Sequence, residues 1–234
     1  MSLKAVILAG GKGKRLRPLT NTIPKSLLEV NGKPILLWQF DWLSRHGVKD
    51  IVLCTGYLRE KLIQEVGSAS THGLRVAYAV EDMPLGTGGA LANAKHLLEK
   101  EDFFYVLNGD VITNLDPSPL KAKVKEGVVG AIALTPLPSP YGIIEFDASS
   151  GIIKRFKEKP SIEEYWINAG VYAFSPEIFG YLPHEGDIEK TSFPALARLS
   201  LLKAVAYPNA MWKSIDSHKD LEEAGKLLSK VRKR

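Results

Sequence analysis

Cysteine, long apolar runs and export signals are scarce or missing in this sequence. Cys54 is the only cysteine among 234 residues, which excludes an intrachain disulfide framework and a cysteine-based zinc site. No apolar run approaches the ~20 residues needed to cross a bilayer. The N-terminus leads into a short apolar segment without a signal-peptide cleavage pattern. A cytoplasmic enzyme or binding protein without a membrane partner remains.

Acidic residues are missing from both ends of the chain. Residues 1–28 contain six cations and no carboxylate, and five more cations follow Glu223 without an acid. The formal net charge is nevertheless only +5, so the middle of the chain is acidic. The basic tail is typical of a solvated helix end. Because no aromatic residues are interleaved with these cations, we expect no nucleic-acid partner.

Strand and helix patterns alternate in the first half of the sequence. Strands are predicted at 3–9, 50–55, 74–80 and 103–107, and helices at 35–46, 57–66 and 88–98. The first and last of these strands lack the alternation of a half-exposed strand, which favours burial on both faces. The pattern predicts an α/β fold, with a mainly parallel sheet and helices on both of its faces.

The pattern is looser in the second half. Strands are predicted at 129–135, 142–146, 151–157, 168–174, 203–206 and 211–214, and helices at 176–182, 191–199 and 217–229. No internal repeat, low-complexity segment or long linker interrupts the chain. We therefore expect one mixed-sheet domain over residues 1–234, in which the part after about residue 115 forms a lobe over one edge.

A glycine-rich basic loop follows the first predicted strand, where open α/β sheets bind ligands. Glycine N–H groups can cradle phosphate oxygens, Arg15 can supply a planar fork of donors, and Lys25 adds a point charge. The loop is not a dinucleotide fingerprint, because Leu16 stands at the third glycine position, and it is not a Walker loop. A plain connection with solvated lysines is the alternative. Six cations without an acid favour phosphate binding.

The loop sequence is also familiar. LAGGKGKRLRPLT at 8–20, followed by PKSLL at 24–28, resembles the signature of sugar-1-phosphate nucleotidylyltransferases, also called nucleotide-sugar pyrophosphorylases. The resemblance implies a Rossmann-like fold of the glycosyltransferase-A type. It also implies that a nucleoside triphosphate (NTP) and a sugar 1-phosphate give a nucleoside diphosphate (NDP) sugar and pyrophosphate. Residues 1–115 would then bind the nucleotide and residues 116–234 the sugar.

The same resemblance implies roles for the loop residues. Arg15 would contact the leaving pyrophosphate, and Lys25 would contact the phosphates at the reacting centre. The backbone near the nucleoside would come from Leu8, Ala9, Gly10, Gly11 and Gly13.

The tripeptide Asn108-Gly109-Asp110 ends the last strand of the first half. Asn-Gly is typical of a hairpin turn, but residues 103–107 do not alternate as a hairpin strand with one wet face would. A buried strand instead places Asp110 in the ligand crevice. With the family's function, Asn108 and Gly109 are then expected beside the nucleotide. Mg²⁺ prefers oxygen ligands and usually takes one or two carboxylates plus phosphates. From spacing alone Asp216 is a helix cap, whereas the resemblance implies that Asp110 and Asp216 bind Mg²⁺.

The PLGTGG loop at 84–89 follows a predicted strand and opens a helix. In one interpretation this segment is a turn in which Thr87 caps the helix and the glycines allow tight packing. The resemblance implies a shelf for the base formed by Pro84, Gly86 and Thr87, with Gly86 allowing close approach and Glu81 recognising the base edge. An ionised carboxylate only accepts hydrogen bonds, and guanine offers two adjacent donors. We therefore predict GTP.

Three short motifs in the second half recur in the family in the same order. They are Tyr-Gly at 141–142, Glu-Lys-Pro at 158–160 and Asn-Ala-Gly at 168–170. Each alone fits a turn, a solvated ion pair or a strand start. The resemblance implies that the Gly142 backbone lies against the sugar and that Glu158 accepts hydrogen bonds from sugar hydroxyls. It also implies that Lys159 contacts the sugar phosphate and that Asn168 forms a hydrogen bond with a sugar hydroxyl.

The predicted function is Mg²⁺-dependent transfer from GTP to mannose 1-phosphate, because Glu81 and residues 84–89 resemble the guanosine-specific branches. Alternatives are a UTP- or dTTP-dependent enzyme for glucose 1-phosphate and a GTP-dependent enzyme for heptose 1-phosphate. A regulatory subunit that binds nucleotide sugars is a non-enzymatic alternative, against which the presence of Arg15, Lys25, Asp110 and Asp216 argues. The β-helix of some family members is not encoded, so we expect a stand-alone catalytic domain; homo-oligomerisation stays open.

Overall fold

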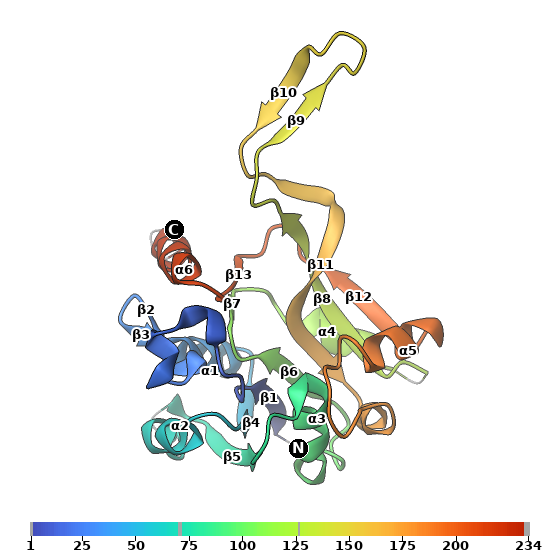
Figure 1. The fold of residues 1–234 in the computed structure, drawn as a ribbon. Coiled ribbons are helices and arrows are strands. Elements are labelled where there is room, and N and C mark those ends of the chain that lie inside the picture. Colours follow the sequence, from blue (N-terminus) through green and yellow to red (C-terminus); the bar gives the residue numbers. More distant parts are fainter. Residues whose placement is uncertain (1, 70–71, 126, 232–234) are drawn as a thin grey trace.

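A seven-stranded sheet forms the centre of the fold in the computed structural model, which describes residues 2–69, 72–125 and 127–231. Its strands are β1 (Leu3–Leu8), β4 (Val48–Thr55), β5 (Arg75–Val80), β6 (Phe104–Asn108), β8 (Gly130–Pro138), β11 (Ser161–Phe174) and β12 (Leu202–Ala206). Their order is β12-β8-β11-β6-β1-β4-β5 (Figure 1). Strand β11 runs antiparallel to β6 and β8, and the other neighbouring pairs are parallel. The second half of the chain thus extends the sheet of the first.

Helices cover both faces of this sheet, as predicted. Helices α1 (Ile35–Arg45), α2 (Arg59–Val66) and α4 (Ser118–Lys123) contribute to one core, and α3 (Gly86–Asn93) and α5 (Ser192–Arg198) to the other. In β1, Ala5 and Ile7 pack into the first core and Val6 into the second. The apolar runs lack alternation because both faces of the strands are buried. The predicted fold class, a Rossmann-like α/β fold with a mixed and mainly parallel sheet, is confirmed.

A third core joins the two ends of the chain. Helix α6 (His218–Val231) packs Ala224 and Leu228 against the residues Leu16, Leu28, Val30, Ile35, Ile112 and Ile215. Nearby, β13 (Trp212–Ser214) pairs antiparallel with β7 (Val111–Thr113), and the Ile215 amide donates to the Asp110 carbonyl over 2.9 Å. The segment before Asp216 is therefore bonded to the segment after Asp110.

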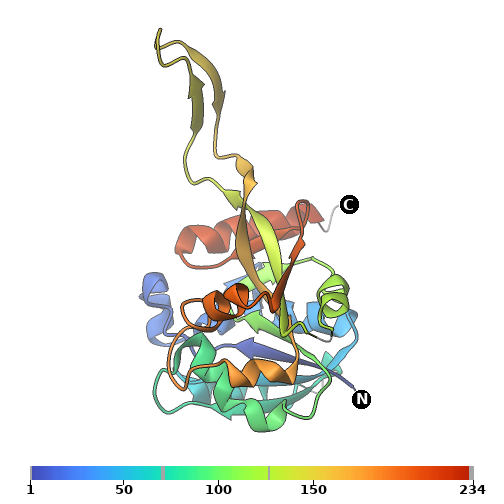
Figure 2. The same ribbon diagram turned by 90° about the vertical axis from the view of Figure 1, so that its right-hand side faces the viewer.

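A two-stranded arm stands away from the body of the molecule (Figures 1 and 2). It consists of β9 (Ile143–Phe146) and β10 (Ile153–Lys157), which pair antiparallel. Smaller elements are β2 (Glu29–Val30), β3 (Lys33–Pro34) and the 3₁₀ turns η1 (Lys14–Leu16), η2 (Leu19–Asn21), η3 (Lys25–Leu27), η5 (Lys95–Leu97) and η6 (Pro176–Gly180). In the described ranges no helix combines the length and the apolar character that a membrane crossing requires.

Several predicted elements are corrected by the structure. The helix expected at 88–98 is α3 followed by the 3₁₀ turn η5, and the helix expected at 176–182 is the 3₁₀ helix η6. Thr87 does not cap α3, because its hydroxyl donates to Glu189 and accepts from the Ile188 amide. These tertiary partners override the local preference of threonine for a cap. The predicted strand at 168–174 begins earlier, at Ser161, and α4 and β7 are additional elements.

Two smaller observations concern Cys54 and the basic tail. Cys54 is buried in β4, and burial raises the pKa of its thiol to about 12, so it stays protonated at neutral pH. Lys226 and Lys230 lie exposed on α6, and residues 232–234 of the tail lie outside the described residues.

The third core is expected to contribute measurably to stability. Leu228 is 6% exposed, so Leu228→Ala should lower the free energy of unfolding by about 2–4 kcal/mol through lost burial and a residual cavity. The control Leu199→Ala changes a leucine that is 58% exposed and should cost less than about 0.5 kcal/mol. Urea unfolding checks both values, and equal losses in the two variants would contradict this role of the third core.

Candidate active site

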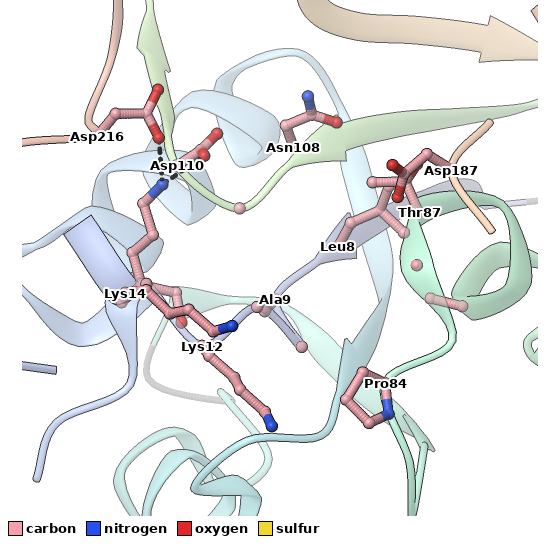
Figure 3. A pocket seen from close by; sticks show the side chains of 18 of the residues that line it. Leu8, Ala9, Lys12, Lys14, Pro84, Thr87, Asn108, Asp110, Asp187 and Asp216 are labelled. Carbon is pink, nitrogen blue, oxygen red and sulfur yellow. Dashed lines mark hydrogen bonds and ion pairs between the residues drawn. The ribbon is translucent and has the colours of Figure 1, made fainter. Parts of the chain in front are cut away.

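A cavity of about 410 Å³ opens where the parallel strands β1, β5 and β6 end (Figure 3). Its walls come from the loop after β1, the loop after β5 and the turn after β6. The lining includes every residue predicted for the nucleotide, its phosphates and the metal: Leu8, Ala9, Gly10, Gly11, Gly13, Arg15, Lys25, Glu81, Pro84, Gly86, Thr87, Asn108, Gly109, Asp110 and Asp216. The structure brings these residues together, while their individual roles stay predictions.

The Lys25 ammonium lies between the two predicted metal ligands. Its Nζ donates to Asp110 Oδ2 over 2.6 Å and to Asp216 Oδ1 over 2.8 Å. Arg15 Nη2 donates to the same Asp216 oxygen over 2.8 Å. The Lys25 side chain is only 15% exposed, whereas that of Arg15 is 75% exposed. Two acids far apart in the sequence thus converge on one charge at the cavity wall.

Burial and charge act in opposite directions on this cluster. Burial by itself would lower the pKa of Lys25, but Asp110 and Asp216 outweigh it, so the pKa is raised. Burial would likewise raise the pKa of Asp216, but hydrogen bonds and charge from Lys25, with Ser214 and Arg15, hold it below the usual range. At neutral pH the cluster therefore contains charged Lys25 and charged Asp216.

Asp216 is free for this cluster because a neighbour caps α6. The Asp220 carboxylate accepts from the Ser217 amide over 2.8 Å, and the Ser217 hydroxyl accepts from the Asp220 amide over 3.3 Å. This reciprocal pair is a capping box with aspartate as its acidic member. The alternative that Asp216 caps the last helix is therefore wrong. Its second oxygen accepts from the Ser214 hydroxyl over 3.0 Å instead.

The paired carboxylates fit a divalent cation. Asp110 and Asp216 supply only oxygen donors, and they already share one positive charge, that of the Lys25 ammonium. Within the described ranges no group of three acidic, histidine or cysteine side chains suited to a metal occurs. Two carboxylates completed by ligand oxygens are the arrangement typical of Mg²⁺, rather than of a cation that needs a full protein cage.

Glu81, the residue directly after β5, also lines the cavity. It is 8% exposed, and its Oε2 accepts from the Leu85 amide over 3.3 Å. Its Oε1 lies 2.4 Å from the place where a Cβ on Gly10 would stand, so Gly10 leaves room for the carboxylate. Burial raises the pKa of Glu81. A half-satisfied buried carboxylate is a strong acceptor for donors of a ligand.

Close packing against another chain segment explains the glycines of the 84–89 loop. A Cβ on Gly86 would stand 2.6 Å from the Gly186 backbone, and the Gly88 amide donates to the Gly186 carbonyl over 2.9 Å. Gly86 also has a φ of +73°, which disfavours other residues. Close approach of another chain segment therefore accounts for Gly86, although the residue still lines the cavity.

The predicted sugar residues are not part of the cavity lining. Gly142 and Glu158 are neighbours at the base of the arm, and Lys159 forms an exposed ion pair with Glu158 over 3.1 Å. Asn168 Nδ2 donates to the hydroxyl of the buried Tyr172 over 2.8 Å.

The cavity also contains residues to which sequence reasoning assigned no role. They are Lys12, Lys14, Leu16, Ser26, Ala90 and Asp187. The lysines belong to the basic loop, and its charge count could have identified them. Asp187 had no local signal, because its place beside Thr87 depends on tertiary packing (Figure 3).

The chain belongs to the nucleotidyl transferase family, whose sequence profile matches residues 4–231. Among its relatives is the mannose-1-phosphate guanylyltransferase catalytic subunit beta of Xenopus tropicalis. That protein is 40% identical over 228 residues, which cover 93% of this chain and 62% of the relative. The chain thus spans less than two thirds of this relative's length.

Two solved structures share the fold. HddC from Yersinia pseudotuberculosis, complexed with GMP-PN, has a TM-score of 0.75 at 27% identity, over 97% of this chain and all of that one. A Bacillus anthracis protein named as a glucose-1-phosphate thymidylyltransferase has a TM-score of 0.76 at 23% identity, over 97% and 95% of the two chains. The second likeness concerns the fold alone.

The stability lost when the shared ammonium is removed should depend on pH. The depressed pKa of Asp216 contributes stability at neutral pH that is lost as the pH falls through the folded-state value. Lys25→Met leaves the two carboxylates facing each other without a cation, and it should lower the free energy of unfolding by about 1–3 kcal/mol at pH 7. Below about pH 4 the carboxylates become protonated, so this loss of stability should become smaller. Urea unfolding at both pH values measures this, with exposed Lys226→Met as control. An equal cost at pH 7 and pH 3 would contradict the electrostatic explanation.

Proposed function

We propose that this protein transfers a nucleoside monophosphate from an NTP to a sugar 1-phosphate, giving an NDP-sugar and pyrophosphate. The best substrate pair is GTP with mannose 1-phosphate. The observation that carries the proposal is the convergence of Lys25, Asp110 and Asp216 on one wall of a cavity formed by the glycine-rich loop. Membership of the nucleotidyl transferase family and the guanylyltransferase relatives support it.

The charged groups suit an in-line displacement. A phosphate oxygen of the sugar 1-phosphate attacks the α-phosphorus of the NTP, a new P–O bond forms, and the bond to pyrophosphate breaks. Such a reaction needs positioning and charge stabilisation rather than a protein nucleophile. Lys25 lies close enough to both acids to act at the reacting centre, and the exposed Arg15 can follow the departing pyrophosphate.

Asp110 and Asp216 would hold Mg²⁺. When bound, such an ion neutralises phosphate charge and orients the phosphate oxygens. The two carboxylates leave the remaining coordination positions for phosphate and water. The fit rests on the oxygen-only donor pair and on the cation that the pair already shares.

Glu81 supports guanine as the base. An ionised carboxylate can accept from the N1–H and the 2-amino group of guanine, whereas uracil and thymine offer one donor flanked by acceptors. Glu81 lines the cavity, and among the described residues its carboxylate accepts one long hydrogen bond, from the Leu85 amide over 3.3 Å. The neighbouring structure HddC is complexed with GMP-PN, which agrees with this choice. The sugar would approach from the side of Asn168, Gly142, Glu158 and Lys159.

A substrate matrix tests the proposal. Pyrophosphate release is measured for GTP, UTP, dTTP, ATP and CTP, each with the 1-phosphates of mannose, glucose and a heptose. We expect the highest kcat/KM with GTP and mannose 1-phosphate.

Glu81→Gln presents a donor as well as an acceptor, so the preference for GTP over UTP should fall at least ~10-fold. Equal turnover of GTP and UTP by the unaltered protein would contradict the role of Glu81, and no turnover of any pair would contradict the function.

Asp110→Asn tests the metal site. The variant keeps the shape of the side chain and should fold normally, but kcat should fall at least ~100-fold, because a charge-stabilising element is lost. Exposed Asp102→Asn, outside the cavity, is the matched control and should keep full activity. Activity of Asp110→Asn close to that of the control would remove Asp110 from the metal site.

A further inference from the structure

Asp187 is a carboxylate in the cavity to which the proposed chemistry gives no role. It lies in the segment between η6 and α5, and it lines the same cavity as the basic loop. Figure 3 shows it beside Thr87, on the opposite side of the view from Asp216. It is therefore separated from the acids that would hold a metal.

The backbone around Asp187 is fixed against α3. The Gly186 amide donates to the Leu85 carbonyl over 2.8 Å, and the Gly186 carbonyl accepts from the Gly88 amide over 2.9 Å. On the other side of Asp187, the Ile188 amide donates to Thr87 Oγ1 over 2.9 Å. Hydrogen bonds on both sides thus determine where the carboxylate stands.

The two oxygens of Asp187 have different surroundings. Oδ2 accepts from Lys190 Nζ over 2.7 Å, and the Lys190 side chain is 79% exposed. Oδ1 lies 3.1 Å from the place where a Cβ on Gly86 would stand, and Gly86 itself lines the cavity. No donor from the described part of the chain reaches Oδ1. One acceptor atom therefore stays available beside the cavity.

Charge decides which ligand group suits this acceptor. The cations of the cavity, among them Lys12, Arg15 and Lys25, come from the loop and turn after β1, and the phosphates belong with them. A carboxylate would repel phosphate and accept from uncharged donors. The proposed substrates offer such donors as the hydroxyls of the ribose and of the hexose.

We propose that Asp187 determines specificity by accepting a hydrogen bond from a hydroxyl of a bound substrate. This inference rests on the proposed function, because it takes the substrates from it. The contact selects for a hydroxylated ring at this wall of the cavity, and a deoxy analogue would leave the carboxylate without its donor.

The test compares the unaltered protein with Asp187→Ala and with the isosteric Asp187→Asn. Steady-state rates are measured with GTP, 2′-deoxy-GTP and 3′-deoxy-GTP, and with mannose 1-phosphate and its four deoxy analogues. Asp187→Ala should lower kcat/KM for the natural pair roughly 10- to 100-fold. With the one analogue that lacks the contacted hydroxyl, Asp187→Ala and the unaltered protein should have nearly the same kcat/KM, because the hydrogen bond is already missing. A GTP analogue that behaves in this way identifies the ribose, and a sugar analogue identifies the hexose.

The control Lys190→Ala removes the ammonium and keeps the carboxylate, so kcat/KM should stay within about 2-fold of the unaltered protein. The proposal is wrong if Asp187→Ala loses the same factor with every analogue, or if neither Asp187 variant loses activity. If the unaltered protein turns over no substrate pair, the proposed function fails. Calorimetric binding of GTP, mannose 1-phosphate and the same deoxy analogues to the same variants then decides the Asp187 contact separately.

Discussion

The sharing of the Lys25 ammonium by Asp110 and Asp216 is the interaction on which the site depends. The two acids are 85 and 191 residues away from Lys25 in the sequence. Their meeting requires parallel pairing of β1 with β6, pairing of β7 with β13, and the third core beneath α6. The mixed sheet and the helix at the C-terminal end thus serve one local arrangement of charges.

The cavity lining combines two chemically different sets of side chains. The lysines and Arg15 come from the loop and turn after β1, and under the proposed function they would bind phosphates beside a divalent cation held by two carboxylates. Glu81 and Asp187 add acceptors to the lining, and these suit neutral donors of a base or a hydroxylated ring. This division matches a substrate that is highly charged at one end and polar but neutral at the other.

Much of the fold could be predicted because strands such as 103–107 are apolar on both faces. This pattern indicates a sheet that is covered by other elements on both of its faces. The basic loop and Asp110 could be located from charge and strand ends alone. Asp216 could not, since its hydrogen bonds depend on Ser217 and Asp220 capping α6 in its place. The cap role considered for Thr87 is wrong, because its hydroxyl is bonded to Glu189 and Ile188, about 100 residues away. Asp187 was missed because no local pattern marks the segment in which it lies.

A crystal structure with Mn²⁺ and a non-hydrolysable GTP analogue tests the central claim most directly, because anomalous scattering locates the ion. The account predicts one peak between the Asp110 and Asp216 carboxylates, with triphosphate oxygens completing its coordination and the base beside Glu81. An ion bound elsewhere, or a nucleotide that lies outside the cavity, would contradict it.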